Sequence, residues 1–405
     1  MNKKISAAVA SAALVLGASS ANAGIIIPAG DWTLDVNGNV NVYATFQDHD
    51  NQGAITGDLM SAVYGTGAAS ANGENNNQSI NTGLLPAWLG FTGTTRQNDL
   101  DVSFTISMQP NVSTNGATGD GAGPLWRQAF LTFGDKSWGS IKMGKDIGIY
   151  ARNAILSDMT LLGVGGGFNN SGASTTTGGI GTGYIYAAWK GQIAYTTPDM
   201  NGLQATIGIT NPNQYSADTL TGSALHQERF GLEGEVNYSF SNGKVWMSGA
   251  SYEVDDDDVG AAAGVTYDIN MIDVGANVNF GNAGLTVYYY TGEGGGNGVL
   301  GYFGAATDGS ERDSDGGYIQ GTYVIPTGTK IGVAYGVTKV DHANALDATN
   351  NAALIEKQAR WTVGAYHPLT KHLNLVAEFN NIESESHNNI DNDAEALSLG
   401  AILFF

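Results

Sequence analysis

Residues that could perform catalysis or bind a metal are few in this sequence and do not cluster. There are six histidines and no cysteine. The absence of cysteine excludes disulfides, thiolate metal sites and a cysteine nucleophile. No histidine lies in a recognisable nucleophilic motif, and four of the six occur in Asn- and Asp-rich stretches that read as loops. We therefore expect solvated histidines and no enzyme.

Two further stretches could bind phosphate or a cation. The glycine run at 163–167 resembles part of a phosphate-binding loop, but no Lys-Ser/Thr pair follows it. The run Asp255–Asp258 could hold a divalent cation through its carboxylates, yet it lacks the spacing of a calcium loop. We expect no cofactor and no metal site, and we interpret the aspartates as a solvated loop. If this loop lies near lipopolysaccharide, its carboxylates could share divalent cations with the lipopolysaccharide phosphates.

Composition limits the possible partners. Charged residues are 14% of the 405 residues, against about 25% in soluble domains. The net charge of −21 argues against nucleic acid as a partner. Residues 1–23 read as a signal peptide, with Lys3 and Lys4, a short apolar core and the A-x-A pattern at 21–23. This predicts an exported chain, 24–405.

The elements that would position any site are long strands with two different faces. From Trp32 to Phe46 every even position is apolar or small, and nearly every odd position is polar. Alternation with a period of two places each set on one face of a strand. The same pattern recurs at 100–109, 230–240, 272–280, 331–337, 373–379 and 397–405. Helical spacing is almost absent.

The connections between these segments alternate in length. Short turn-like joins fall at 96–98, 134–137, 198–201, 241–243, 281–282, 326–328 and 368–370. Long polar joins fall at 47–83, 110–123, 147–188, 211–225, 255–262, 293–314, 341–356 and 384–392. Fifteen joins imply about sixteen strands. Such a chain is typical of an all-β, transmembrane antiparallel β-barrel of the bacterial outer membrane, with short periplasmic turns and long outer loops.

Aromatic residues at the row ends support a membrane span. Phe240 and Phe280 lie near short turns, and Phe46, Tyr252 and Tyr289 lie near long loops. Two aromatic belts are expected of a barrel in a bilayer, and sixteen strands leave room for an aqueous channel. A secreted adhesin or β-solenoid is the alternative fold, but it would show a short fixed repeat, which is not found.

Several segments resemble the general trimeric porins of Gram-negative bacteria. Residues 88–93 read W-L-G-F-T-G, similar to the early R-L-G-F-K-G strand of that family. The R-Q-A-F-L-T-F-G stretch at 127–134 and the W-G-S-I-K-M-G-K stretch at 138–145 resemble the next family hairpin. Residues 193–203 resemble the V-R-Y-x-S-P-N-F-x-G-F segment, and Phe405 matches the usual last residue.

The resemblance implies a homotrimer, passive diffusion of small hydrophilic solutes and ions, and a long third loop folded into the lumen. Residues 147–188 occupy the place of that loop. In the family, arginines on one wall of the constriction face carboxylates on the inserted loop. Here Arg127 matches one arginine, whereas Trp88 and Ala194 replace two others. Lys142, Lys145 and Arg152 could contribute positive charge.

The remaining predicted pore residues are acidic. We place Asp158 on the third loop. The inward-facing acids predicted by parity are Asp35, Asp99, Asp101, Glu233, Glu235, Asp273, Glu378 and Glu395, and the inward-facing bases are Arg96, Arg127, Lys142, Lys330 and Arg360. Inward acids outnumber inward bases on this count, so we expect a cation-preferring porin. A substrate-specific outer-membrane channel, or a barrel enzyme, is the alternative function.

Overall fold

The computed structural model describes residues 24–59, 76–110, 112, 125–166, 175–211, 229–256 and 265–405. The predicted signal peptide therefore lies outside the described residues. In the part of the chain that the structure describes, no helix is both long and apolar enough to cross a membrane.

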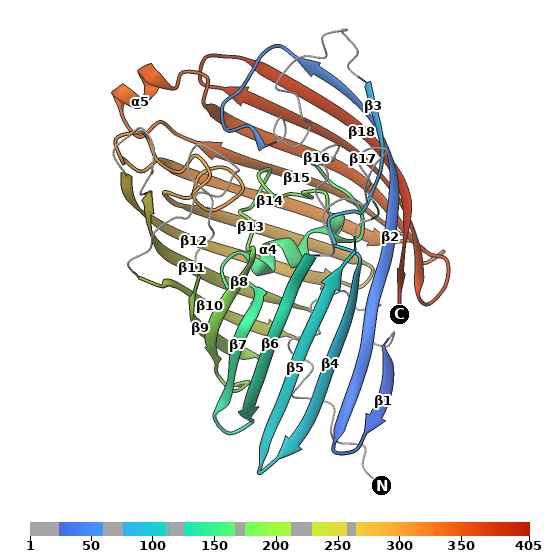
Figure 1. Ribbon diagram of the computed structural model, residues 1–405. Helices are drawn as coiled ribbons and strands as arrows, with labels where there is room; N and C mark the ends of the chain where they lie inside the picture. The colour runs from blue at the N-terminus through green and yellow to red at the C-terminus, as the bar shows by residue number, and fades with distance from the viewer. Residues whose placement is uncertain are drawn as a thin grey trace, which may run out of the picture.

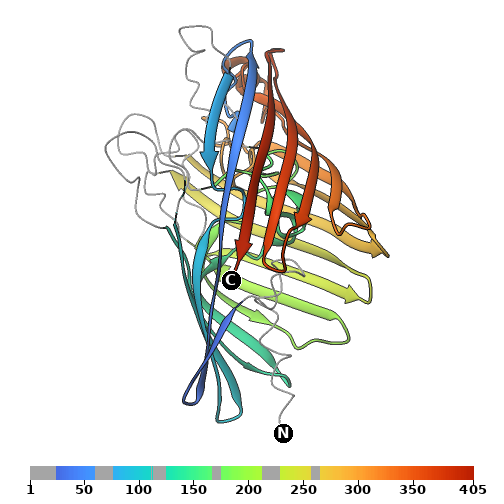
Figure 2. The same cartoon turned by 90° about the vertical axis from the view of Figure 1, so that its right-hand side faces the viewer.

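The described residues form one antiparallel sheet that closes on itself, as Figures 1 and 2 show. Closure is made by β18, which pairs with β2 from Asn392 opposite Asn51 to Phe404 opposite Asn39. The strands are β1 (Ile25–Ala29), β2 (Trp32–Asn51), β3 (Asn76–Asn81), β4 (Trp88–Gln97), β5 (Leu100–Gln109), β6 (Leu125–Asp135), β7 (Gly139–Ile147), β8 (Trp189–Thr196), β9 (Leu203–Thr210), β10 (Gly231–Phe240), β11 (Gly243–Asp256), β12 (Val265–Phe280), β13 (Ala283–Glu293), β14 (Asp313–Val324), β15 (Lys330–Val340), β16 (Ile355–Pro368), β17 (Leu373–Ser386) and β18 (Asp391–Phe404).

Two of these strands continue others, so the wall has the predicted sixteen positions. β3 pairs with residues 43–48 of β2, and β4 pairs with residues 33–39 of β2. β3 and β4 therefore form one interrupted strand beside β2. β1 pairs with the start of β2, in line with the end of β18. The sixteen-stranded antiparallel barrel is confirmed, and the seven predicted short joins all connect neighbouring strands.

Asparagine side chains support the wall where β3 and β4 are interrupted. The chain leaves the sheet at residues 82–87, and its carbonyl groups need donors because buried backbone groups are costly to leave unpaired. Asn39 Nδ2 donates to the Pro86 carbonyl at 3.0 Å, and Asn41 Nδ2 donates to the Leu85 carbonyl at 2.9 Å. Gly83 N–H donates in turn to Asn41 Oδ1 at 2.8 Å. Inward-facing asparagines therefore replace ladder hydrogen bonds here.

The two faces of the wall differ as the alternation predicts. Val40, Val42 and Phe46 are exposed on the outer face of β2, whereas Asn39 and Asn41 are buried on the inner face. The prediction that Tyr252 belongs to an outer aromatic belt is wrong. Tyr252 is 1% exposed and faces inward, because it lies one residue out of step with the outer row of β11, where Val245 and Met247 are exposed.

The outer row allows a direct test of the membrane span. Replacing Val274, which is 53% exposed on β12, by arginine should destabilise the barrel by about 2–4 kcal/mol if the site lies near the bilayer midplane. The inward-facing Asn277 of the same strand should tolerate arginine far better. Unfolding in denaturant, measured after refolding into lipid vesicles, compares the two variants. Equal losses at both positions would contradict this assignment of the faces.

Candidate functional site

We call residues 148–188, between β7 and β8, the inserted segment, because its described residues lie within the ring of strands. Its described parts, 148–166 and 175–188, include the helix α4 (Arg152–Ser157) and the short 3-10 helix η1 (Met159–Leu162). Figure 1 shows α4 inside the barrel. The described parts of the segment contact inward-facing side chains of strands from β10 round to β2.

The segment begins at a buried carboxylate. Glu233 of β10 accepts hydrogen bonds from the N–H groups of Ile149, at 2.5 Å, and Tyr150, at 3.2 Å. The Lys190 ammonium group donates to the same carboxylate at 2.8 Å, and both side chains are at most 3% exposed. Glu233 thus joins both ends of the segment, since Lys190 lies just beyond its end.

A second carboxylate of β10 holds α4. The Arg152 guanidinium donates to the two oxygens of Glu235 at 2.9 and 3.0 Å, and Asn153 Nδ2 donates to Glu235 at 2.8 Å. Lys244 of β11 donates to Asn153 Oδ1 at 2.5 Å. Bidentate arginine–carboxylate pairs fix orientation as well as position. The contacts of Arg152 and Asn153 with Glu235 therefore fix the orientation of α4 against β10.

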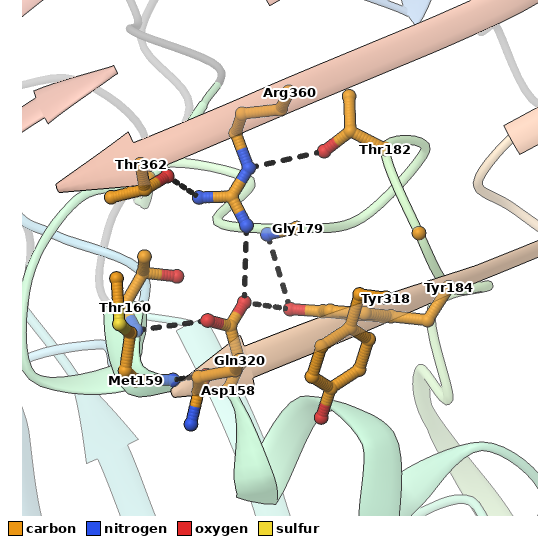
Figure 3. A network of polar contacts seen from close by, with 12 residues as sticks. Asp158, Met159, Thr160, Gly179, Thr182, Tyr184, Tyr318, Gln320, Arg360 and Thr362 are labelled. Carbon is orange, nitrogen blue, oxygen red and sulfur yellow. Dashed lines mark hydrogen bonds and ion pairs between the residues drawn. The ribbon is translucent and has the colours of Figure 1, made fainter. Parts of the chain in front are cut away.

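Asp158 fixes the middle of the segment, as Figure 3 shows. Its Oδ1 accepts from Thr160 N–H at 2.9 Å and caps η1. Its Oδ2 accepts from the Tyr184 hydroxyl at 2.9 Å and lies 3.7 Å from the Arg360 guanidinium of β16. Burial raises the pKa of Tyr184 well above its ordinary value, and the neighbouring Asp158 carboxylate adds to the effect. The hydroxyl therefore keeps its proton and remains a donor.

A carboxylate of β17 also holds the segment. Glu378 accepts from the successive N–H groups of Val164, at 2.9 Å, and Gly165, at 2.8 Å, and from the Tyr366 hydroxyl at 2.6 Å. On β2, the Tyr43 hydroxyl donates to the Leu162 carbonyl at 2.7 Å. With β14 contributing Gln320, which accepts from Met159 N–H at 2.6 Å, the segment follows the inner wall from β10 to β2.

Among the described residues, no hydrogen bond or ion pair joins strands β4 to β8 to α4 or η1. Several inward-facing side chains of these strands are partly exposed, whereas others, such as Gln109 and Gln192, are buried. The partly exposed ones are Thr92, Thr105, Gln128, Thr132 and Lys142. Lys142 pairs with Asp146, and its ammonium group lies 4.9 Å from the centre of the Phe130 ring. Gln128 also donates to Asp146, at 3.1 Å. This strip, together with the partly exposed Arg152 of α4, is the candidate channel lining.

The predicted pore residues divide into three groups. Trp88, Lys142 and Arg152 lie on the inner side, with Trp88 Nε1 3.4 Å from Asn37 Oδ1. Asp101 also faces inward but lies near the β4–β5 turn, where it pairs with Arg96 at 2.8 Å. Asp158 lies inside the barrel on the side of β16, paired with Arg360.

Two predicted lumen bases lie on the outer row instead. Lys145 is exposed and pairs across the ladder with Ala129, next to the exposed Met143 and Leu131. Arg127 is two residues from Ala129, and its guanidinium lies 6.0 Å from the ring of Trp189, which also belongs to an outer row. The pairing of β5 with β6 shifts register beside it, between Ser107 and Gln109. The inward assignment of both bases is therefore wrong.

Two predicted inward acids are also misplaced. Asp99 has a φ of 63° and lies in the tight turn with Asn98, whose φ is 47°. Such a two-residue turn with both φ values positive matches the twist of a hairpin. Glu395 is exposed on β18, on the row of Leu397 and Leu399. Neither carboxylate belongs to the lumen.

Sequence reasoning missed Asp146, Lys190 and Tyr184. Asp146 has the same parity as Lys142, and Lys190 the same parity as Ala194, so alternation alone could have placed both on the inner row. Tyr184 gave no comparable signal, because it lies in a loop. No group of three or more His, Asp or Glu side chains among the described residues could hold a metal ion. Asp257 and Asp258 lie outside those residues.

Comparison with known proteins gives the class. Residues 10–387 match the sequence profile of the family described as Gram-negative porin. The fold is similar to that of the outer membrane channel DcaP of Acinetobacter baumannii, at 17% identity and a TM-score of 0.68, over 95% of this chain and 100% of that one. It is also similar to OmpF of Salmonella typhi, at 17% identity and a TM-score of 0.59, over 94% and 100%. No curated protein matches the sequence.

The chain therefore belongs to the Gram-negative porin family. The family and the sixteen-stranded fold make it an outer-membrane channel protein.

Proposed function

We propose that the mature chain forms a homotrimeric, water-filled channel for passive diffusion of ions and small hydrophilic solutes. The observation that carries this proposal is the strip of partly exposed, inward-facing polar side chains on β4 to β8. Polar lining without a continuous apolar barrier suits hydrated solutes. An OmpT structure of Vibrio cholerae at 13% identity and a TM-score of 0.56 is described as a trimer, which supports the assembly.

Single-channel recording of purified protein in a planar bilayer tests the proposal. Discrete conductance steps that arrive in threes would support a trimeric channel. Cross-linking of the protein in detergent, followed by mass determination, checks the subunit number independently. A protein that folds but gives no steps would contradict diffusion.

A substrate-specific channel is the second candidate, favoured by how much of the lumen is filled. Tyr150, Tyr184, Tyr288 and Tyr290 are at most 2% exposed although they face inward or lie inside the barrel. A narrow remaining passage could favour one class of solute. Saturating block of the conductance by a single sugar or carboxylate would favour this candidate over general diffusion.

We also propose that the channel prefers cations, because of the carboxylates around its outer entrance. The inward acids Glu233, Glu235 and Glu378 are buried and hydrogen-bonded, so their charge is largely offset. The outer ends of β2 and β18 instead carry exposed carboxylates on their outward-facing rows, at the rim of the barrel. These are Asp48, Asp50, Asp391, Asp393 and Glu395. A field of one sign at an entrance raises the local concentration of counter-ions, and carboxylates at this height would also meet lipopolysaccharide.

The expected result is a reversal potential of cation-selective sign across a KCl gradient at about 0.1 M. The selectivity should decrease near 1 M, because the Debye length falls from about 10 to about 3 Å. Replacing Asp391 and Asp393 by asparagine should lower the selectivity without changing the size limit. Anion selectivity at low salt would contradict the preference and leave the channel itself intact.

A further inference from the structure

The connection between β13 and β14, predicted as an outer loop, is buried. Residues 294–298, 300–302 and 304–306 are all buried, and only Val299 and Phe303 between them are partly exposed. A loop exposed at the cell surface would not bury apolar side chains such as Leu300, which is 2% exposed, or Tyr302, at 6%. We call residues 294–306 the second loop, because they are the second connection that lies inside the barrel after the inserted segment.

Inward-facing side chains from two distant strands hold the second loop. The Tyr267 hydroxyl of β12 donates to the Gly301 carbonyl at 3.2 Å. Asn297 Nδ2 donates to Gln358 Oε1 of β16 at 3.0 Å and to the Gly57 carbonyl at 2.9 Å. Since β12 and β16 are separated by three other strands of the wall, the loop crosses the interior rather than extending above the rim.

The second loop is packed directly on the inserted segment. Tyr186 N–H donates to the Gly298 carbonyl at 2.7 Å, and Tyr186 forms a parallel bridge with Val299. Gly298 has a φ of +73°, and a Cβ added there would lie 2.8 Å from the Gly181 Cα. Only glycine allows both the left-handed backbone and this close approach. The glycine-rich sequence thus serves close packing inside the barrel.

An ion pair holds the base of the loop. The Arg312 guanidinium donates to both carboxylate oxygens of Asp347, each at 2.7 Å, and to the Phe303 carbonyl at 3.1 Å. Asp347 belongs to the short helix α5 (Ala345–Asn350) of the next outer loop. Although burial acts to raise the pKa of Asp347, hydrogen bonds from Arg312 and the Ala343 N–H hold it well below its usual range. The pair therefore stays charged.

We infer that the second loop is a second constriction element, which closes the outer half of the lumen between β12 and β16 and sets the size limit of the solutes that pass. With that side filled, the passage is confined to the strip on β4 to β8. The inference rests on the proposed diffusion function, and it adds the element that determines which solutes are small enough.

Removing the tip of the loop tests this inference. Gly296 and Tyr302 are bridge partners, so residues 297–301 can be excised and the two joined through two glycines. The conductance of the variant should rise at least about twofold, and vesicle swelling should admit larger sugars, because pore radius limits both. A matched control replaces the exposed Thr307 and Asp308 of the same connection by glycine, and should conduct like the parent protein.

A second measurement does not depend on the excised variant folding. Because the chain has no cysteine, the pair Tyr186→Cys and Val299→Cys should cross-link on oxidation if the loop lies inside, and conduct at the parent level when cross-linked. Failure to cross-link, or an excised variant with parent conductance and size limit, would overturn the inference. If the parent protein itself gives no conductance, the proposed diffusion function fails instead.

Discussion

Replacing Asp158 by alanine is expected to lower the free energy of unfolding by about 3–5 kcal/mol, since it leaves the buried Arg360 guanidinium without its carboxylate. The side chains of both residues are at most 4% exposed. The same change removes the acceptor for the Tyr184 hydroxyl and the cap of η1. The inserted segment should therefore loosen on the side of β16, and single-channel current should become noisier. Denaturant unfolding and planar-bilayer recording measure the two effects.

A matched pair of variants separates charge from packing. Asp101→Asn removes the ion pair between Asp101 and Arg96. At 2.8 Å this pair is shorter than that of Asp158 with Arg360, but the side chain of Arg96 is 47% exposed and that of Asp101 is 27% exposed. The Asp101→Asn variant should lose no more than about 1 kcal/mol. The double variant Asp158→Ala with Arg360→Met should recover much of the loss, because an apolar replacement removes the unpaired charge. Equal losses for Asp158→Ala and Asp101→Asn would show that the buried pair has no special role.

Replacing Glu233 by glutamine should have a comparable effect, about 3–5 kcal/mol, because the Lys190 ammonium group would remain buried opposite a neutral amide. Glutamine keeps an oxygen that can accept from the N–H groups of Ile149 and Tyr150. The loss therefore reports the charge of the carboxylate rather than its shape. Denaturant unfolding in detergent gives the free energy.

The control for this variant lies on the neighbouring strand. Glu253→Gln on β11 breaks a partly exposed contact with Arg229 at 3.7 Å, and should change stability by less than about 1 kcal/mol. Adding Lys190→Met to Glu233→Gln should restore part of the stability. If Glu233→Gln alone unfolds like the parent protein, the buried pair does not hold the ends of the inserted segment together.

The barrel could be predicted from the sequence because its signal is local. Each strand shows its two faces within a few residues, as from Trp32 to Phe46, and short and long joins alternate along the chain. Lys145 and Glu395 lie in regularly paired strands, on the outer rows of Met143 and Leu397, so parity alone would have placed both outside. Two other residues were assigned wrongly because the local structure departs from the regular pattern. Arg127 lies beside a register shift between β5 and β6, and Asp99 lies in a turn, where parity has no meaning.

The sequence by itself therefore determined the membrane-spanning wall, its strand number and most of its faces, because period-two alternation encodes which side of a strand meets lipid. Only the tertiary structure decided what fills the lumen. Asp158 meets Arg360, and Asn297 meets Gln358, across the interior of the closed barrel. The direction in which a loop folds depends on buried partners far away in the chain. No local pattern distinguishes the glycine-rich second loop inside the barrel from a glycine-rich loop in water.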